Sequence, residues 1–179
     1  DLSRPISWQA ALPAIGLLSL IGLVRLKLLC TPLPPNDFMI YWAAGRLFLS
    51  HANPYSAAAV FAIERSIGWT DSEPMSVLYP PWLLPLVAFP ALLPFRVAHY
   101  GWLAASLILE AVSSIALWRY FGGKKEKQWI ALVVLATFLP TGKAEHMGQL
   151  TPLILAGLVA VLYLLRYKHD FVAGLCLLA

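Results

Sequence analysis

Long apolar stretches separated by short polar segments dominate the hydrophobicity pattern of the chain. The first stretch, residues 6–29, predicts a helix of about 36 Å, enough to cross a hydrocarbon core of about 30 Å. Arg25, Lys27 and Cys30 occupy its end where a signal peptide would carry small residues, so we expect a retained anchor. Later apolar stretches predict further spans over residues 97–118, 129–147, 150–165 and 171–179. The pattern predicts an all-α fold, a polytopic transmembrane helical bundle forming one domain over residues 1–179.

The last of these stretches is still apolar where the sequence stops at Ala179. Nine residues of helix are too short to cross a membrane. We therefore expect the sequence to be a fragment of a longer protein.

An apolar segment at residues 78–95 differs from the predicted spans because it carries five prolines. Proline removes backbone donors and breaks the helical hydrogen-bond ladder, and lipid offers no replacement partners. We therefore expect a proline-broken, re-entrant helix that dips into the membrane without crossing it.

Charge sets the expected orientation of the chain. The connections at residues 119–127 and 166–169 are short and basic, which predicts that both are cytoplasmic. If residues 78–95 do not span, the N-terminus lies on this same side and residues 30–96 form a long outer loop. If they do span, residues 30–77 move to the cytoplasmic side and the N-terminus moves outside, which fits the basic residues less well.

The outer loop has a pattern of its own, which is typical of a functional loop. Residues 38–50 have apolar positions at helical spacing and predict a helix lying in the membrane interface. Ser56 predicts the N-cap of a second helix at residues 57–65. Asp37 stands at the start of the first helix, where it is either an N-cap or a carboxylate positioned as a general base.

Composition excludes several classes of protein. The chain is 60% hydrophobic and 12% charged, with a mean hydropathy of +0.72, which excludes a water-soluble globule. Two distant cysteines exclude a disulfide-framed secreted domain. The bases behind the pI of 9.2 are scattered or flank apolar stretches, so nucleic-acid binding is not expected.

Few polar side chains lie near the predicted spans. Residues 141–149 are expected to form a short outer turn, where Lys143, His146 and Gln149 could contact a phosphate or sugar, or could simply be solvated at the end of a span. Glu110 lies in the middle of a span, on the helical face of Ser106, Ser113 and Ser114, which favours helix–helix bonding over catalysis. No spacing of ligand residues predicts a metal site, and no cofactor is expected.

Several short motifs follow one another along the chain. Each motif alone is a weak signal, but their order and spacing are specific. They are Asp37-Phe38 with Tyr41, Ala43 and Ala44, then Asn53-Pro54-Tyr55, Tyr79-Pro80-Pro81, Leu93-Pro94-Phe95, Gly148-Gln149 and Ala173-Gly174. Together they resemble the N-terminal half of the GT-C superfamily of membrane glycosyltransferases, most of all glycosyltransferase family 87, the polyprenyl-phosphate-mannose-dependent alpha-mannosyltransferases.

The resemblance implies an integral-membrane enzyme of a bacterial cytoplasmic (inner) membrane with its active site on the outer face. It implies a polyprenyl-phosphate hexose donor, mannose above others, a glycolipid or glycan acceptor, and transfer with inversion. Asp37 maps onto the general base of the family. Substrate contacts are expected from Tyr41, Tyr55, Tyr79, Lys143, His146 and Gln149.

Two other functions stay open at this point. A chain that ended at residue 179 would favour a non-catalytic transmembrane scaffold, a subunit of a larger membrane complex, because half a cavity cannot hold both substrates. A transporter or channel is less favoured because Glu110 alone offers a charged site within a predicted span.

Overall fold

The computed structural model describes residue 16, residues 19–23, residue 27 and residues 36–176. The predicted span at residues 6–29 and the first residues of the outer loop therefore lie largely outside the described residues. Helix accounts for 74% of the structure, and the described part of the chain contains no strand. The predicted all-α class is confirmed, whereas only one of the described helices is long and apolar enough to cross a membrane by length and composition.

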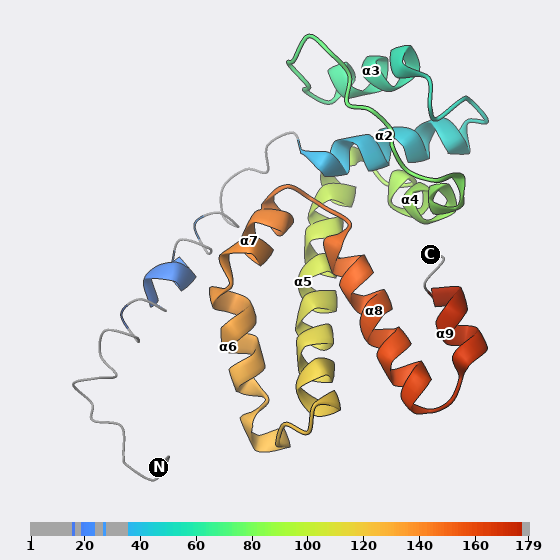
Figure 1. The fold of residues 1–179 in the computed structure, drawn as a ribbon. Coiled ribbons are helices and arrows are strands. Elements are labelled where there is room, and N and C mark those ends of the chain that lie inside the picture. The colour runs from blue at the N-terminus through green and yellow to red at the C-terminus, as the bar shows by residue number, and fades with distance from the viewer. Residues whose placement is uncertain (1–15, 17–18, 24–26, 28–35, 177–179) are drawn as a thin grey trace.

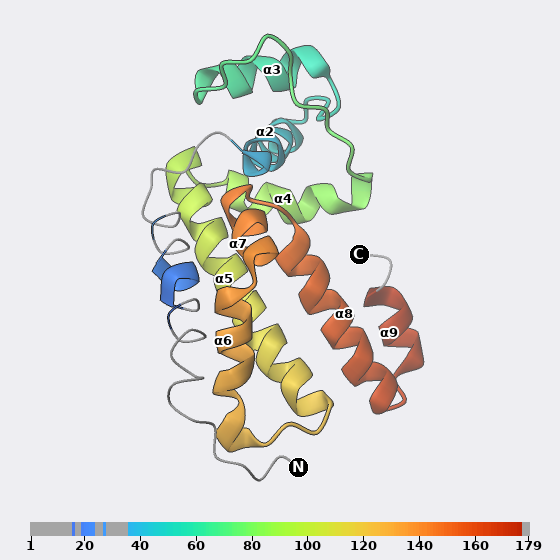
Figure 2. The same cartoon turned by 60° about the vertical axis from the view of Figure 1, so that its left-hand side comes forward.

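The molecule has two regions, which we call the head (residues 36–94) and the stem (residues 95–176). The head contains α2 (Asp37–Leu49), α3 (Ala57–Ser66), a 3-10 turn at Pro81–Leu83 and α4 (Leu84–Ala91). Its helices lie across one end of the long helix α5 (Phe95–Tyr120) (Figures 1 and 2).

The stem continues from α5 through a 3-10 turn at Lys125–Lys127 to α6 (Trp129–Thr137), α7 (Leu139–His146), α8 (Thr151–Arg166) and α9 (Asp170–Cys176). Helices α6 and α8 flank α5 on opposite sides, and α9 packs against α8 (Figure 1). The chain turns back toward the head through α7, so that the start of α8 lies near the start of α2.

The predicted helices of the head are present, and α2 is more completely buried than its pattern predicted. Nine of its thirteen residues are buried. A side chain at Gly45 would clash with the carbonyl oxygen of Val87 in α4, so the two helix backbones touch there. Helix α2 is therefore the centre of the hydrophobic core of the head.

The proline-rich segment 78–95 forms short helical elements, as its prolines predict. Pro81 and Pro85 stand at helix starts, where a missing N–H costs nothing, and Pro94 precedes α5. Helix α4 has only eight residues and cannot cross a membrane.

The segment predicted as a span at residues 129–147 is instead two helices. Phe138 has an extended backbone (φ −79°, ψ 100°) and separates α6 from α7. Pro140 explains the break, because its ring and its missing N–H prevent α6 from continuing. The expected outer turn at 141–149 is also wrong in its first part, since α7 runs to His146.

The remaining predicted spans correspond to helices. The span at 97–118 lies within α5, which has 26 residues and the length and apolar composition of a membrane-crossing helix. The span at 150–165 corresponds to α8, which has 16 residues and falls short of the usual 20. Helix α9 begins at Asp170, and residues 177–179 lie outside the described residues.

Candidate functional site

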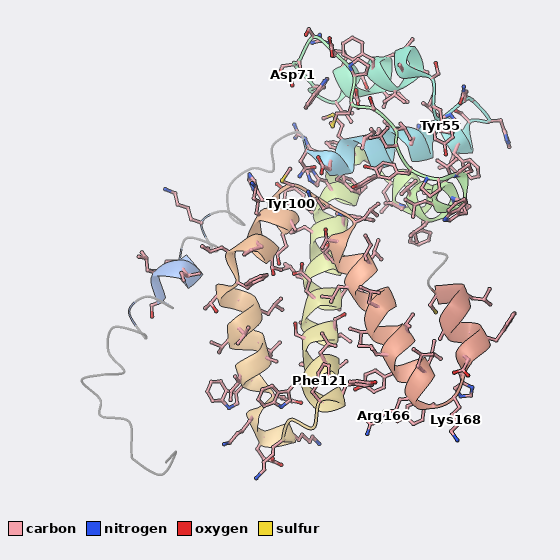
Figure 3. The ribbon with its side chains drawn as sticks, viewed as in Figure 1. Tyr55, Asp71, Tyr100, Phe121, Arg166 and Lys168 are labelled. Carbon is pink, nitrogen blue, oxygen red and sulfur yellow. The ribbon has the colours of Figure 1, made fainter. Side chains whose placement is uncertain are left out.

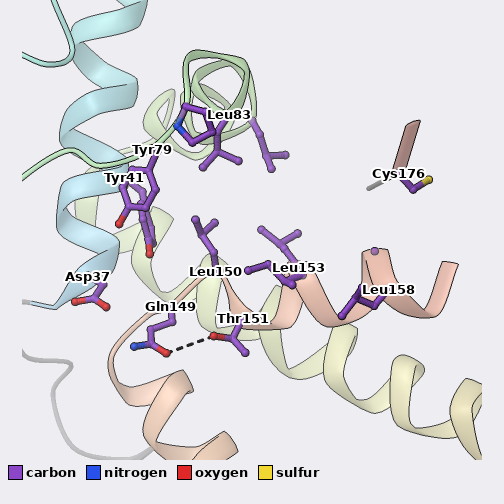
Figure 4. A pocket seen from close by; sticks show the side chains of 14 residues that line it. Asp37, Tyr41, Tyr79, Leu83, Gln149, Leu150, Thr151, Leu153, Leu158 and Cys176 are labelled. Carbon is purple, nitrogen blue, oxygen red and sulfur yellow. Dashed lines mark hydrogen bonds between the residues drawn. The ribbon is translucent and has the colours of Figure 1, made fainter. Parts of the chain in front are cut away.

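A cavity of about 650 Å³ lies where the start of α2, the segment before α4 and the start of α8 meet. Its polar side chains gather at one end, and leucine and isoleucine side chains line the rest (Figure 4). The lining residues are Asp37, Tyr41, Tyr79, Pro80, Leu83, Leu86, Gln149, Leu150, Thr151, Leu153, Ile154, Gly157, Leu158 and Cys176. Four of the residues expected at a substrate site, Asp37, Tyr41, Tyr79 and Gln149, are thus in one place.

Asp37 is the first residue of α2, and it is not the N-cap, one of the two roles expected from its position. The N-cap is Asn36, whose side-chain oxygen accepts a hydrogen bond from the Phe38 N–H at 3.2 Å. Because the Asn36 side chain caps the N-terminus of α2, the Asp37 carboxylate is not needed as the cap and instead lines the cavity (Figure 4). The partial positive charge of the helix N-terminus stabilises a carboxylate at this position.

The backbone around Asp37 is fastened to the end of α7. The Asp37 N–H donates to the Met147 carbonyl at 2.9 Å, and the Asn36 side-chain amide donates to the His146 carbonyl at 2.8 Å. These two bonds hold the carboxylate against the turn that leads into α8.

Gly148 makes this close approach possible. Its φ of +66° is in the left-handed region, and an added Cβ would come within 2.9 Å of the Phe38 Cβ. The Trp102 indole N–H of α5 donates to the Gly148 carbonyl at 3.1 Å. The turn is therefore locked against both α2 and α5, and it places Gln149 at the polar end of the cavity.

Tyr41 and Tyr79 form an edge-to-face pair on the cavity wall, with ring centroids 4.8 Å apart. Burial raises the pKa of the Tyr41 phenol far above its usual value of 10, and the hydrogen bond that it donates to Tyr79 and the nearby Asp37 act in the same direction. Burial also raises the pKa of Tyr79. Both phenols are therefore neutral at physiological pH. Tyr79 accepts the Tyr41 proton and keeps its own proton to donate to a ligand, whereas the Tyr41 oxygen can accept.

Tyr55 does not line the cavity, although it was expected among the substrate contacts. Its hydroxyl donates to the Tyr79 carbonyl at 2.9 Å, and its ring is exposed. Tyr55 thus holds Tyr79 in place from outside.

Glu64 is a buried carboxyl group that the sequence analysis missed. It is fully buried, and its Oε2 accepts the Met75 N–H at 3.2 Å, while its backbone carbonyl accepts the Trp69 N–H at 2.9 Å. Burial raises the pKa of this carboxyl above its usual 4.5, against a smaller lowering by the Met75 N–H. Glu64 fastens the segment that leads to Tyr79. The sequence did contain a signal for this burial. Glu64 lies four residues after the apolar Val60, and residues four apart share one face of a helix.

Lys143 and His146 do not line the cavity. The Lys143 side chain is exposed on α7, and the backbone carbonyl of His146 accepts the bond from Asn36. Within the described residues, no lysine, arginine or histidine lines the cavity. In the same part of the chain, no group of three or more His, Cys, Asp or Glu side chains could hold a metal ion.

Glu110 lies apart from the cavity, in the middle of α5. It is buried together with Ser106 and Ser113, as expected of a face that packs against neighbouring helices.

Searches of the curated proteins and of the solved structures found no match to the chain. The model of one protein family, described as glycosyltransferase family 87, matches residues 78–178, more than half of the chain. The match includes Tyr79, Gln149 and all of α4 to α9, and Asp37 and Tyr41 precede it. The motifs of the sequence, the helical fold and this match agree, and the chain belongs to glycosyltransferase family 87.

Proposed function

We propose that this glycosyltransferase transfers a hexose, mannose above others, from a polyprenyl-phosphate donor to a hydroxyl group of a lipid or glycan acceptor. In this proposal the protein crosses a bacterial inner membrane several times, and residues 30–96 lie on the outer side. The observation that carries it is the Asp37 carboxylate at the polar end of a cavity whose remaining wall is apolar.

The two ends of the cavity suit the two parts of a lipid-linked sugar. A sugar has many hydroxyl groups, which the Tyr41 and Tyr79 phenols and the Gln149 amide can hydrogen-bond. An isoprenoid chain has only apolar surface, which the leucine side chains of α4 and α8 can cover. A soluble nucleotide-sugar donor would leave this apolar wall without a partner.

Asp37 is the proposed general base. Its carboxylate accepts the proton of the acceptor hydroxyl as that oxygen forms its bond to the anomeric carbon. The bond from the anomeric carbon to the phosphate oxygen breaks at the same time, and its electron pair leaves with the polyprenyl phosphate. Attack from the side opposite the leaving group inverts the anomeric carbon, with oxocarbenium character in the transition state.

The first test is Asp37→Asn in the full-length protein, assayed for transfer of mannose from polyprenyl-phosphate mannose. Removing a general base is expected to lower kcat by at least about 100-fold. Donor binding should persist, because the asparagine has the same shape. Asp71→Asn is the matched control, since Asp71 is an exposed aspartate of the same head region.

Unchanged transfer by Asp37→Asn would overturn the role of Asp37. A wild-type protein that binds neither donor nor acceptor and transfers no sugar would instead favour the scaffold function.

A further inference from the structure

The end of the stem that is farthest from the head carries a concentration of exposed positive charge. Six exposed cations lie there, against the two acids Glu126 and Asp170. They belong to the α5–α6 and α8–α9 connections and to the helix ends beside them, and we call them the basic face: Arg119, Lys124, Lys125, Lys127, Arg166 and Lys168. Among residues 36–176, the head and α7 together carry three cations and five acids, so they have no excess of positive charge.

Packing between α5 and α8 joins the two connections into one surface. The Tyr163 hydroxyl donates to the Ala116 carbonyl at 2.8 Å, and Arg166 donates to the Tyr120 carbonyl at 3.2 Å. The Arg166 guanidinium also lies over the Tyr120 ring, 5.4 Å from its centroid. The ends of α5 and α8, which are 46 positions apart in the chain, are therefore held together, and Figure 3 shows Phe121 at this end of α5 and Arg166 and Lys168 at the end of α8.

Exposed aromatic side chains accompany these cations. Phe121 is 76% exposed, Tyr167 66% and Trp129 58%. Aromatic rings beside lysine and arginine at the end of an apolar helix are typical of the headgroup layer of a bilayer, where rings contact the acyl boundary and cations reach the phosphates. An aqueous partner such as a nucleic acid would leave these rings without a partner.

The backbone at Lys168 supplies a separate observation. Lys168 has a φ of +61° at the end of α8, where its N–H donates to the Leu165 carbonyl and the His169 N–H donates to the Leu164 carbonyl. Glycine is the usual residue in such a left-handed position, because a side chain strains it. Lys168 therefore places an exposed charge at a position where glycine is the usual residue.

We propose that the basic face binds the phosphate headgroups of anionic phospholipids in the leaflet opposite the head. The proposal rests on the membrane placement given under the proposed function, but it does not depend on sugar transfer. Each lysine near an anionic membrane surface adds to binding, and the contribution falls with ionic strength. The face thereby fixes which end of the stem meets the anionic leaflet, and the cavity meets the other side.

The test uses the purified full-length protein in a neutral detergent and native mass spectrometry of bound lipid. Dioleoyl-phosphatidylglycerol and dioleoyl-phosphatidylcholine are supplied in equal amounts, since they share their acyl chains and differ in headgroup charge. We expect the wild type to retain phosphatidylglycerol preferentially. Lys168→Gln should reduce this preference by about fivefold, and the variant with Lys124, Lys125 and Lys127 also changed to glutamine should abolish it.

Lys143→Gln is the matched control, because Lys143 is an exposed lysine near the head end of the stem. It should leave the preference unchanged. An equal loss in Lys143→Gln, or an unchanged preference in the fourfold lysine variant, would overturn the proposal.

A second pair of variants separates charge from folding. Lys168→Gly relieves the strained backbone and should raise thermal stability while lowering the phosphatidylglycerol preference. His51→Gly relieves the corresponding strain in the head, where His51 has a φ of +56°, and should raise stability with no change in lipid preference. Retention of the full lipid preference by Lys168→Gly would contradict the proposal.

Discussion

Helices α2 and α5 bury opposite kinds of side chain. Nine of the thirteen residues of α2 are buried, and large apolar side chains such as Phe38 and Met39 are among them. Only five of the 26 residues of α5 are buried, and three of these are Ser106, Glu110 and Ser113. Between Arg96 and Arg119, its large exposed side chains, among them Ile108 and Val112, are apolar.

The difference indicates where each region obtains its stability. The head folds around its own hydrophobic core, as a protein does in water. The stem presents apolar side chains outward and joins its helices through small and polar side chains, which is typical of helices surrounded by lipid. Variants that act by steric packing should therefore damage the head far more than the stem.

The largest expected effect comes from filling the contact between α2 and α4. Gly45→Val puts a side chain against the Val87 carbonyl and the Ala91 Cβ, and should lower the free energy of unfolding by about 3 kcal/mol. Gly101→Val in α5 is the matched control, because a Cβ at Gly101 meets no atom within 4 Å, and it should change stability by less than about 1 kcal/mol. Chemical unfolding in detergent, followed by tryptophan fluorescence, measures both. Equal losses would contradict the distinction between the two regions.

A smaller effect is expected at the turn that meets Asp37. Gly148→Ala adds a Cβ in a left-handed conformation and against Phe38, and should cost about 2 kcal/mol. Gly122→Ala, in the α5–α6 connection, shares the positive φ (+84°) but meets no atom within 4 Å, so only the backbone strain of about 1 kcal/mol applies. If Gly148→Ala is no worse than Gly122→Ala, then the close approach to α2 contributes nothing to stability.

The smallest expected effect concerns pH and the buried carboxyl of the head. Burial raises the folded-state pKa of Glu64, so the folded protein holds its proton to a higher pH than the unfolded chain does. Protonated Glu64 therefore stabilises the folded protein at pH values below its unfolded-state pKa of about 4.5. This contribution to the free energy of unfolding is lost as the pH rises through the higher folded-state pKa. The free energy of unfolding of Glu64→Gln should depend less on pH across this range than that of the wild type. At neutral pH it should be higher than that of the wild type.

Glu73→Gln is the control for this measurement, because Glu73 is an exposed glutamate of the same segment. Its unfolding should follow the pH dependence of the wild type. An identical pH profile for Glu64→Gln and the wild type would show that the carboxyl is not perturbed by its burial.

Local signals in the sequence predicted the elements well. The helices at 38–50, 57–65, 97–118 and 150–165 all exist, with ends within two residues of those expected. Apolar spacing, the Ser56 cap and the prolines of segment 78–95 act over a few residues, which is why they can be read from the sequence. The third span was expected to be short and to meet Pro140, and α6 does end just before it, at Thr137, but the second helix α7 was not predicted.

The cavity was less predictable, because contacts between distant residues form it. Asp37 and Asn36 are equally good N-caps by residue type, and the bond from Asn36 to the His146 carbonyl, 110 residues away, is a contact that the sequence does not indicate. The sequence analysis predicted Asp37, Tyr41, Tyr79 and Gln149, which the structure brings together. It also predicted Lys143, His146 and Tyr55, which lie outside the cavity. No residue of α7 lines the cavity, and the spacing of its polar side chains does not indicate this.

The bond between Asn36 and His146 also has a consequence for biosynthesis. The ribosome makes Asn36 long before it makes His146, and at about 5–20 residues per second the 110-residue separation takes about 5–20 s. During this interval the Asp37 N–H and the Asn36 amide lack their native acceptors. The core of the head can assemble early, whereas the polar end of the cavity forms only after α7 has left the ribosome. Nascent chains stalled before residue 146 should therefore contain a folded head but no completed site.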